Sequence, residues 1–250
     1  MSNLVKVTAD RQGEQSDEAR TNGALQDFIR DCTVDTAIYL ESCIHCGLCA
    51  EACQFYVQTG DPRYTPVWKL EPFKQAYKRE AGPFSIFYKA LNLKHRVTVD
   101  ELESWQHLLY DACTLCGRCS LVCPMGIDVA SLIGMARHGM FRAGLVPKDL
   151  YVLAQRAEDT GNPQGVSPEL FRETIERLAG EHSLDIPLDK AAADILVTVS
   201  AAEISDYPVS IVAMARVMKR AGYEWSYSRL GFDATHFGLL SGYTVWQGDM

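Results

Sequence analysis

The sequence predicts a mainly α-helical protein with a small C-terminal α/β appendage. Apolar residues recur at helical spacing through most of the first 182 residues, and a β-rich run appears only after them. Eight of the nine cysteines fall in two copies of one motif. With 47% apolar and 22% charged residues, the chain can bury a sizeable core, so disorder of the whole chain is excluded.

Residues 1–22 are polar and charged, and we expect a flexible arm there, with a short strand at 4–7. An arm that becomes ordered on a partner is the alternative. From Ala24 onward, four apolar residues follow the spacing of one buried helix face: Leu25, Phe28, Ile29 and Cys32. Cys32 is interpreted as a small buried hydrophobe, with an extra ligand or redox thiol as the alternative.

Between the two cysteine motifs, prolines 62, 66, 72 and 83 are expected to divide the chain into short helices. Thr98 and Glu101 have the spacing of a capping box, which predicts the start of a longer helix. The inward face of that helix carries four large residues: Leu102, Trp105, Leu108 and Leu109.

Three further helices are expected after the second motif. They run over 127–143, ending at Gly144, from Pro147 to Gly161, and from Ser167 and Pro168 to Gly180. We therefore expect a helical domain over 23–145 and a helical connector over 146–182.

The composition changes in residues 183–250. Strands are expected at 195–199 and 225–228, with a helix over 209–221 between them. One β-α-β unit is too small to stand alone as a sheet. Its aromatic residues are therefore expected to be covered by the rest of the fold or by a partner.

The two motifs carry the chemistry. C-I-H-C-G-L-C-A-E-A-C begins at Cys43, and C-T-L-C-G-R-C-S-L-V-C-P begins 70 residues later at Cys113. Both have the spacing C-x2-C-x2-C-x3-C, which lets three thiolates of one loop point at three corners of an iron–sulfur cube. The glycine after the second cysteine lets backbone amides approach the sulfides and stabilise the charge added on reduction.

In two-cluster ferredoxins the fourth cysteine of such a run ligates the other cluster. Transferred to this sequence, that rule predicts two [4Fe–4S] clusters with crossed ligands. Cluster 1 takes Cys43, Cys46, Cys49 and Cys123, and cluster 2 takes Cys53, Cys113, Cys116 and Cys119. Zinc is the alternative metal, although its sites usually combine two C-x2-C pairs. Gln54 stands where the second copy has Pro124, so the backbone after the two loops is not expected to be identical.

The charge pattern excludes several function classes. There are 24 basic and 32 acidic residues, a net charge of −8, which disfavours nonspecific nucleic-acid binding. No apolar run predicts a transmembrane segment, and the opening residues lack the apolar core of a secretory signal, so a cytoplasmic location is expected.

No nucleotide-binding, P-loop or nucleophile-elbow motif occurs. We expect a redox subunit without a substrate site of its own, and whether it is itself an enzyme stays open.

The motif pair and its long helical insert, over residues 24–145, resemble α-helical ferredoxins. These occur in the iron–sulfur relay subunit of heterodisulfide reductase and in iron–sulfur subunits of flavin dehydrogenases. Residues 193–208 and 231–243 are similar to the corresponding relay subunit of the heterodisulfide reductase-like complexes of sulfur-oxidising bacteria, and look like the opening of a CCG domain without its cysteines. The resemblance implies an electron relay between a flavin- and cluster-bearing subunit and a CCG-domain catalytic subunit in cytoplasmic sulfur oxidation.

Two alternatives stay open. The first is the iron–sulfur subunit of a flavin-linked glycerol-3-phosphate or glycolate dehydrogenase, although such chains commonly continue into an intact CCG domain. The second is a zinc-binding scaffold that only binds other proteins. Elemental analysis separates the scaffold from both redox interpretations.

Overall fold

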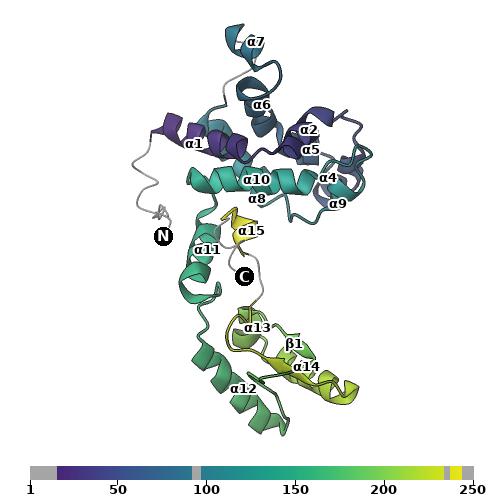
Figure 1. Cartoon of the computed structure of the whole chain (residues 1–250), viewed down its shortest axis with the longest axis vertical. Coiled ribbons are helices and arrows are strands. Elements are labelled where there is room, and N and C mark those ends of the chain that lie inside the picture. The colour runs from purple at the N-terminus through teal and green to yellow at the C-terminus, as the bar shows by residue number, and fades with distance from the viewer. Residues whose placement is uncertain (1–15, 92–96, 234–236, 244–250) are drawn as a thin grey trace. The chain divides into compact units, whose positions relative to one another are not determined.

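A computed structural model describes residues 16–91, 97–233 and 237–243 of the chain. The strand expected at 4–7 lies outside these residues. The described chain is mainly helical, as predicted, and divides into two compact units (Figure 1). Unit 1 comprises Met1–Tyr151 and Gly238–Met250, and unit 2 comprises Val152–Phe237.

Unit 1 contains the two cysteine motifs within a set of mostly short helices. In chain order its elements are α1 (Asp17–Arg30), α2 (Val34–Ser42), α3 (Leu48–Glu51), α4 (Gln54–Thr59), the 3-10 helix η2 (Pro62–Tyr64), α5 (Pro66–Lys69), α6 (Glu71–Glu80), α7 (Ser85–Ala90), α8 (Val99–Tyr110), α9 (Arg118–Leu121), α10 (Val129–Arg142), the start of α11 (Lys148–Thr160) and most of α15 (Phe237–Ser241).

The first helix begins earlier than expected. Ser16 caps α1, and its hydroxyl accepts a hydrogen bond from the Ala19 N–H at 3.3 Å. Residues 17–22, expected to belong to a flexible arm, are therefore helical. The capping box of α8 is confirmed, since the N–H of Glu101 donates to Thr98 Oγ1 at 3.3 Å and the N–H of Thr98 donates to Glu101 Oε2 at 2.9 Å.

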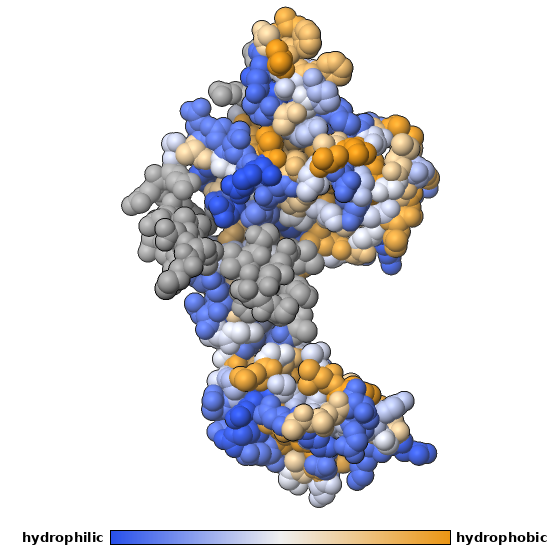
Figure 2. All heavy atoms as spheres, in the orientation of Figure 1, coloured by the Kyte–Doolittle hydropathy of each residue, from blue (hydrophilic) through white to orange (hydrophobic). Residues whose placement is uncertain are grey.

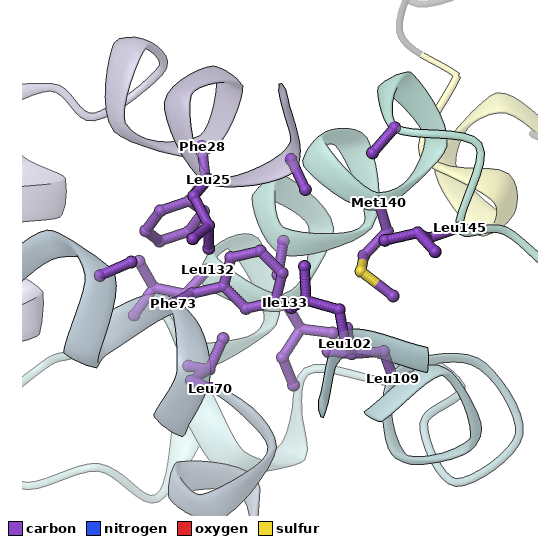
Figure 3. Close-up of a cluster of buried hydrophobic side chains, with 14 of the residues drawn as sticks. Leu25, Phe28, Leu70, Phe73, Leu102, Leu109, Leu132, Ile133, Met140 and Leu145 are labelled. Atoms are coloured by element: carbon purple, nitrogen blue, oxygen red, sulfur yellow. The ribbon is translucent and has the colours of Figure 1, made fainter. Parts of the chain in front are cut away.

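The core of unit 1 lies where α1, α6, α8 and α10 meet, and Figure 3 shows their large apolar side chains pointing toward one another. Phe28 of α1 and Phe73 of α6 are fully buried, with ring centroids 5.0 Å apart. The inward face predicted for α8 is confirmed by the burial of Leu102, Leu108 and Leu109. Cys32, interpreted as a small buried hydrophobe, is only half-buried, although it packs against this core.

Unit 2 contains the predicted β-α-β arrangement. Its elements are the rest of α11, then α12 (Pro168–His182), β1 (Ile195–Val197), α13 (Ala201–Ser205), α14 (Val209–Ala221) and β2 (Trp225–Tyr227). The two strands are parallel, and Ile195 is paired with Trp225 in the register.

Helix α12, expected to be part of a connector, packs in the core of unit 2. The Phe171 ring lies 5.8 Å from that of Tyr227 and 4.9 Å from that of Phe232. Trp225, Tyr227 and Phe232 are buried within this unit, so the protein's own fold covers them. The structural division therefore differs from the predicted boundary at residue 183, because a two-stranded sheet needs a helix to cover its apolar face.

The segment after unit 2 returns to unit 1. The Tyr110 hydroxyl donates to the Ser241 carbonyl at 3.1 Å, and the Tyr243 ring lies 4.9 Å from that of Phe141. Residues 238–243 therefore belong to unit 1, whereas a single C-terminal tail over 183–250 was expected. Across the three described ranges, no helix is long and apolar enough to cross a bilayer.

Candidate functional site

The two cysteine loops follow the same backbone path. His45 and Leu115 both have a φ of 53°, in the left-handed region that few side chains adopt. Gly47 and Gly117 follow with φ of 84° and 75°, and each directly precedes a four-residue helix, α3 or α9. The local geometry of the duplicated motif is therefore duplicated as well.

The paths diverge after the fourth cysteine, as the Gln54 and Pro124 difference predicts. In the first copy, helix α4 starts at Gln54 immediately after Cys53. In the second copy, the Gly126 N–H donates to the Cys123 carbonyl at 3.0 Å, which makes a turn that leads toward α10. This divergence sends the chain in a different direction after each loop.

The structure brings the eight motif cysteines together around two cavities. One cavity is lined by Cys43, Cys46, Cys49 and Cys123. The other is lined by Cys53, Cys113, Cys116 and Cys119. Each cavity therefore has three cysteines from one copy of the motif and the fourth from the other copy.

The donor set of each cavity fits a [4Fe–4S] cluster, which is held by four thiolates. Apolar side chains complete the walls, among them Leu70 and Ile127 in the first cavity and Ile133 in the second. Among residues 16–91, 97–233 and 237–243, no three His, Cys, Asp or Glu side chains converge in a way that could hold a single metal ion.

Burial raises the pKa of two of these thiols, Cys49 and Cys119. It raises the pKa of the Cys49 thiol, and the neighbouring thiols Cys43, Cys46 and Cys123 raise it further, while the backbone of Val67 opposes the change. Burial likewise raises the pKa of Cys119 to about 11. The ligating form is the thiolate, so these positions need a nearby cationic centre to hold it.

Cys116 behaves in the opposite way. It is exposed, and a backbone hydrogen bond from Arg118 lowers the pKa of its thiol. The exposed cysteine of the other loop is Cys46. Each cavity thus has one cysteine that is exposed to solvent.

Sequence reasoning missed two cations beside the second cavity. Lys69 and Arg137 are each 1% exposed. Lys69 Nζ lies 3.7 Å from Cys53 Sγ, and Arg137 Nη2 donates to the Cys113 carbonyl. In the sequence, Lys69 stands between the apolar residues Trp68 and Leu70. This pattern does not show whether the lysine side chain is buried or exposed.

The charged residues inside the loops are solvent-facing. His45 is exposed, with Nε2 3.3 Å from Lys74 Nζ, and Arg118 is exposed on α9. Asp128 is the N-cap of α10, and its carboxylate accepts hydrogen bonds from the N–H of Ser131 and the hydroxyl of Ser120. Asp128 therefore caps this helix.

Exposed apolar side chains surround the cysteine loops. Figure 2 shows hydrophobic atoms on the surface of unit 1 around α4 and α9, and also over α7. Leu121 is 87% exposed, Ile44 63% and Met125 47%. Ile44 and Met125 line the first cavity, and Leu121 is the last residue of α9, the helix that follows the second loop.

A protein family described as a 4Fe–4S dicluster domain matches residues 39–127, the span that holds both motifs. The chain is 27% identical over 222 residues to the Hdr-like menaquinol oxidoreductase iron-sulfur subunit 2 of Archaeoglobus fulgidus, which covers 84% of this chain and 40% of the relative. Here Hdr denotes heterodisulfide reductase. Over most of its length the chain is thus similar to Hdr-like iron–sulfur subunits.

Two further relatives cover less of the chain. One is the EtfAB:quinone oxidoreductase of Syntrophomonas wolfei, with 27% identity over 178 residues, 65% of this chain and 24% of the relative. The other is a subunit of the dihydromethanophenazine:CoB–CoM heterodisulfide reductase of Methanosarcina barkeri, with 27% identity over 109 residues, 43% and 25% of the two chains.

The chain spans about 40% of the length of the two Archaeoglobus relatives that cover most of it. No solved structure matches it. The dicluster match and the names of the Archaeoglobus and Methanosarcina relatives agree on a similarity to iron–sulfur proteins of the heterodisulfide reductase type.

Proposed function

We propose that the chain carries two [4Fe–4S] clusters with crossed ligands and relays electrons within a cytoplasmic Hdr-like complex. Cluster 1 takes Cys43, Cys46, Cys49 and Cys123, and cluster 2 takes Cys53, Cys113, Cys116 and Cys119. The observation that carries the proposal is the grouping of these same cysteines around two separate cavities. When bound, each cluster supplies a reversible one-electron site.

The chain's own residues provide the surroundings that such a site needs. Thiolates anchor the metal, and the left-handed glycines Gly47 and Gly117 allow the loop backbone to turn closely around it. Buried apolar walls exclude water from one side of each cavity. The exposed Cys46 and Cys116 bring each site to the surface, where a partner's redox centre can approach.

For the partners we propose a flavin- and cluster-bearing subunit on one side and a CCG-domain subunit on the other, in the oxidation of reduced sulfur compounds. The resemblance of residues 193–208 and 231–243 to the relay subunit of sulfur-oxidising complexes supports this setting. The net charge of −8, more negative once thiolate-bound clusters are present, favours docking on basic surfaces.

A second setting is a quinone-linked oxidoreductase. The two Archaeoglobus relatives and the Syntrophomonas wolfei relative have names that contain menaquinol or quinone oxidoreductase. Purification of the chain from its native source distinguishes the settings. A co-purifying CCG-domain subunit with a flavin protein supports the first, and a quinone-reactive membrane subunit supports the second.

Metal analysis and crossed substitutions test the ligand assignment. The anaerobically purified chain is expected to contain about eight irons and about eight sulfides. Cys53→Ser should alter the same electron paramagnetic resonance (EPR) signal as Cys116→Ser, and Cys123→Ser the same signal as Cys46→Ser. Cys32→Ser is the matched control and should leave both signals unchanged.

Two results would contradict the proposal. A zinc-loaded protein without visible absorbance would remove the relay function altogether. If Cys53→Ser instead alters the same EPR signal as Cys46→Ser, each motif holds its own cluster and the ligands are not crossed.

A further inference from the structure

The ammonium group of Lys69 is buried beside the second cavity. Lys69 is 1% exposed, and its Nζ donates to the Ala112 carbonyl at 2.5 Å and to Cys53 Sγ at 3.7 Å. The same Nζ lies 5.1 Å from the centroid of the Phe55 ring. Within the described part of the chain, no carboxylate pairs with it.

A buried ammonium without a carboxylate is costly, because desolvation of a charge needs compensation by an opposite charge. The anionic group nearest to Lys69 is the Cys53 sulfur, once it is a thiolate. The backbone of Lys69 is also fixed, since the Trp105 indole N–H donates to its carbonyl at 3.2 Å. The position of this charge is therefore built into the packing between α5 and α8.

A second buried cation, Arg137, contacts the backbone of a cysteine that lines the same cavity. Arg137 donates to the carbonyls of Leu109 and Cys113, and its guanidinium lies 5.0 Å from the centroid of the Tyr110 ring. Lys69 and Arg137 are the buried basic side chains among the residues that the structure describes. Both contact cysteines that line the second cavity, Cys53 and Cys113.

The first cavity has no buried cation among the described residues. The cation that lines it is Lys74, whose Nζ pairs with the exposed imidazole of His45 at 3.3 Å. Lys74 is only partly buried, and a charge that water reaches is screened more strongly than a charge in a low-dielectric interior. The two sites therefore differ in the charge that surrounds them.

Two other determinants of reduction potential are matched between the sites. The loops have the same backbone conformation, so their amides present similar donors: φ is 53° at both His45 and Leu115. Each cavity also has one exposed cysteine. Buried positive charge is the clear difference, and positive charge stabilises the electron added on reduction.

We infer that Lys69, supported by Arg137, makes the site of Cys53, Cys113, Cys116 and Cys119 the higher-potential one of the two. This inference rests on the proposed function. One electron shared between the sites then resides preferentially at the second site, and an electron that enters at the first site moves downhill to it within the chain. The difference between the two reduction potentials arises from the two buried cations, because the two loops have the same backbone conformation.

The test is redox potentiometry of the full iron-loaded chain, followed by EPR. Cys46→Ser and Cys116→Ser assign each signal to a site. In Lys69→Met, the ratio of reduced to oxidised second site, measured at its wild-type midpoint, should fall about tenfold, which for one electron corresponds to about 59 mV. The first site should not change. Lys69→Arg should restore most of the ratio. The control Lys89→Met, at an exposed position of α7 that lines neither cavity, should change neither site by more than about twofold.

Iron content separates failure of this inference from failure of the proposed function. Fewer than about eight irons in the wild-type chain would contradict the proposed function itself. A fully loaded chain in which Lys69→Met shifts neither site, or both sites equally, overturns the role of Lys69. If Lys69→Met does not bind iron, the midpoint potentials of the wild-type chain still test the inference. A midpoint potential of the second site equal to or below that of the first would contradict it.

Discussion

Gly139 of α10 lies directly against the backbone carbonyl of Ala24 in α1, so closely that a methyl group at position 139 would overlap with that oxygen. Two side-chain pairs link the same helices. Arg142 Nε lies 3.2 Å from Asp27 Oδ2, and His138 Nδ1 lies 2.5 Å from Asp31 Oδ2. The close approach of α1 and α10 is thus a central contact of unit 1.

Gly139→Ala is expected to lower the free energy of unfolding of unit 1 by about 1–3 kcal/mol, because backbone cannot move away as a flexible side chain can. Gly134→Ala is the matched control on the same helix, since no atom lies within 4 Å of a methyl group there. It should raise stability by about 0.5–1 kcal/mol. Urea unfolding followed by circular dichroism measures both, and equal effects of the two substitutions would contradict the close approach.

Removal of iron is expected to loosen unit 1 and leave unit 2 intact. The cysteine-lined cavities lie in unit 1, whereas unit 2 has its own buried core and no cysteine. After anaerobic chelation, hydrogen exchange should accelerate in α3, α9 and α10 and stay unchanged in α12 and α14. Faster exchange in both units would show that the metal stabilises the whole chain.

The stability of α13 is expected to fall in acid. Backbone and hydroxyl hydrogen bonds from Ser200 lower the pKa of Glu203 below its ordinary value of 4.5, against the opposing effect of burial. A carboxylate with a lowered pKa stabilises the fold above that ordinary value, and this stability is lost as the pH falls through the folded-state pKa. Hydrogen exchange of α13 between about pH 6 and about pH 3 measures the loss.

Glu203→Gln should remove this pH dependence while keeping the helix, because glutamine also completes a capping box and does not titrate. Glu173→Gln, on the exposed face of α12, serves as the control and should behave like the wild-type chain. An acid response of Glu203→Gln equal to that of the wild type would mean that another group is responsible.

Cys32 is expected to alkylate slowly in the iron-loaded protein. Burial, and to a smaller extent the charge of Asp31, raises the pKa of its thiol to about 11. Only the thiolate reacts, so the rate of iodoacetamide labelling should rise about tenfold per pH unit from about pH 7 to about pH 10. Glutathione in the same solution should level off near about pH 9, and mass spectrometry follows both products. A plateau for Cys32 at that same pH would contradict the raised pKa.

Much of the local structure was predictable because its signals lie between neighbours in the chain. The Thr98 and Glu101 capping box starts α8, Gly222 ends α14, and Ser167 with Pro168 starts α12, each at the predicted residue. The cysteine spacing likewise specified two equivalent loops. The start of α1 at Asp17 was missed, because Ser16 gave a weak capping signal among polar residues.

The sequence did not predict which residues far apart in the chain lie side by side, because tertiary packing decides this. Nothing near Lys69 in the chain indicates that its ammonium lies beside Cys53, since Lys69 is buried by the packing of α5 against helices distant in the sequence. The return of 238–243 to unit 1 likewise depends on the hydroxyl of Tyr110 and the guanidinium of Arg137. Spacing along the chain therefore decides which residues can hold metal, whereas the three-dimensional packing decides which charges surround each site, because burial is a property of the whole fold.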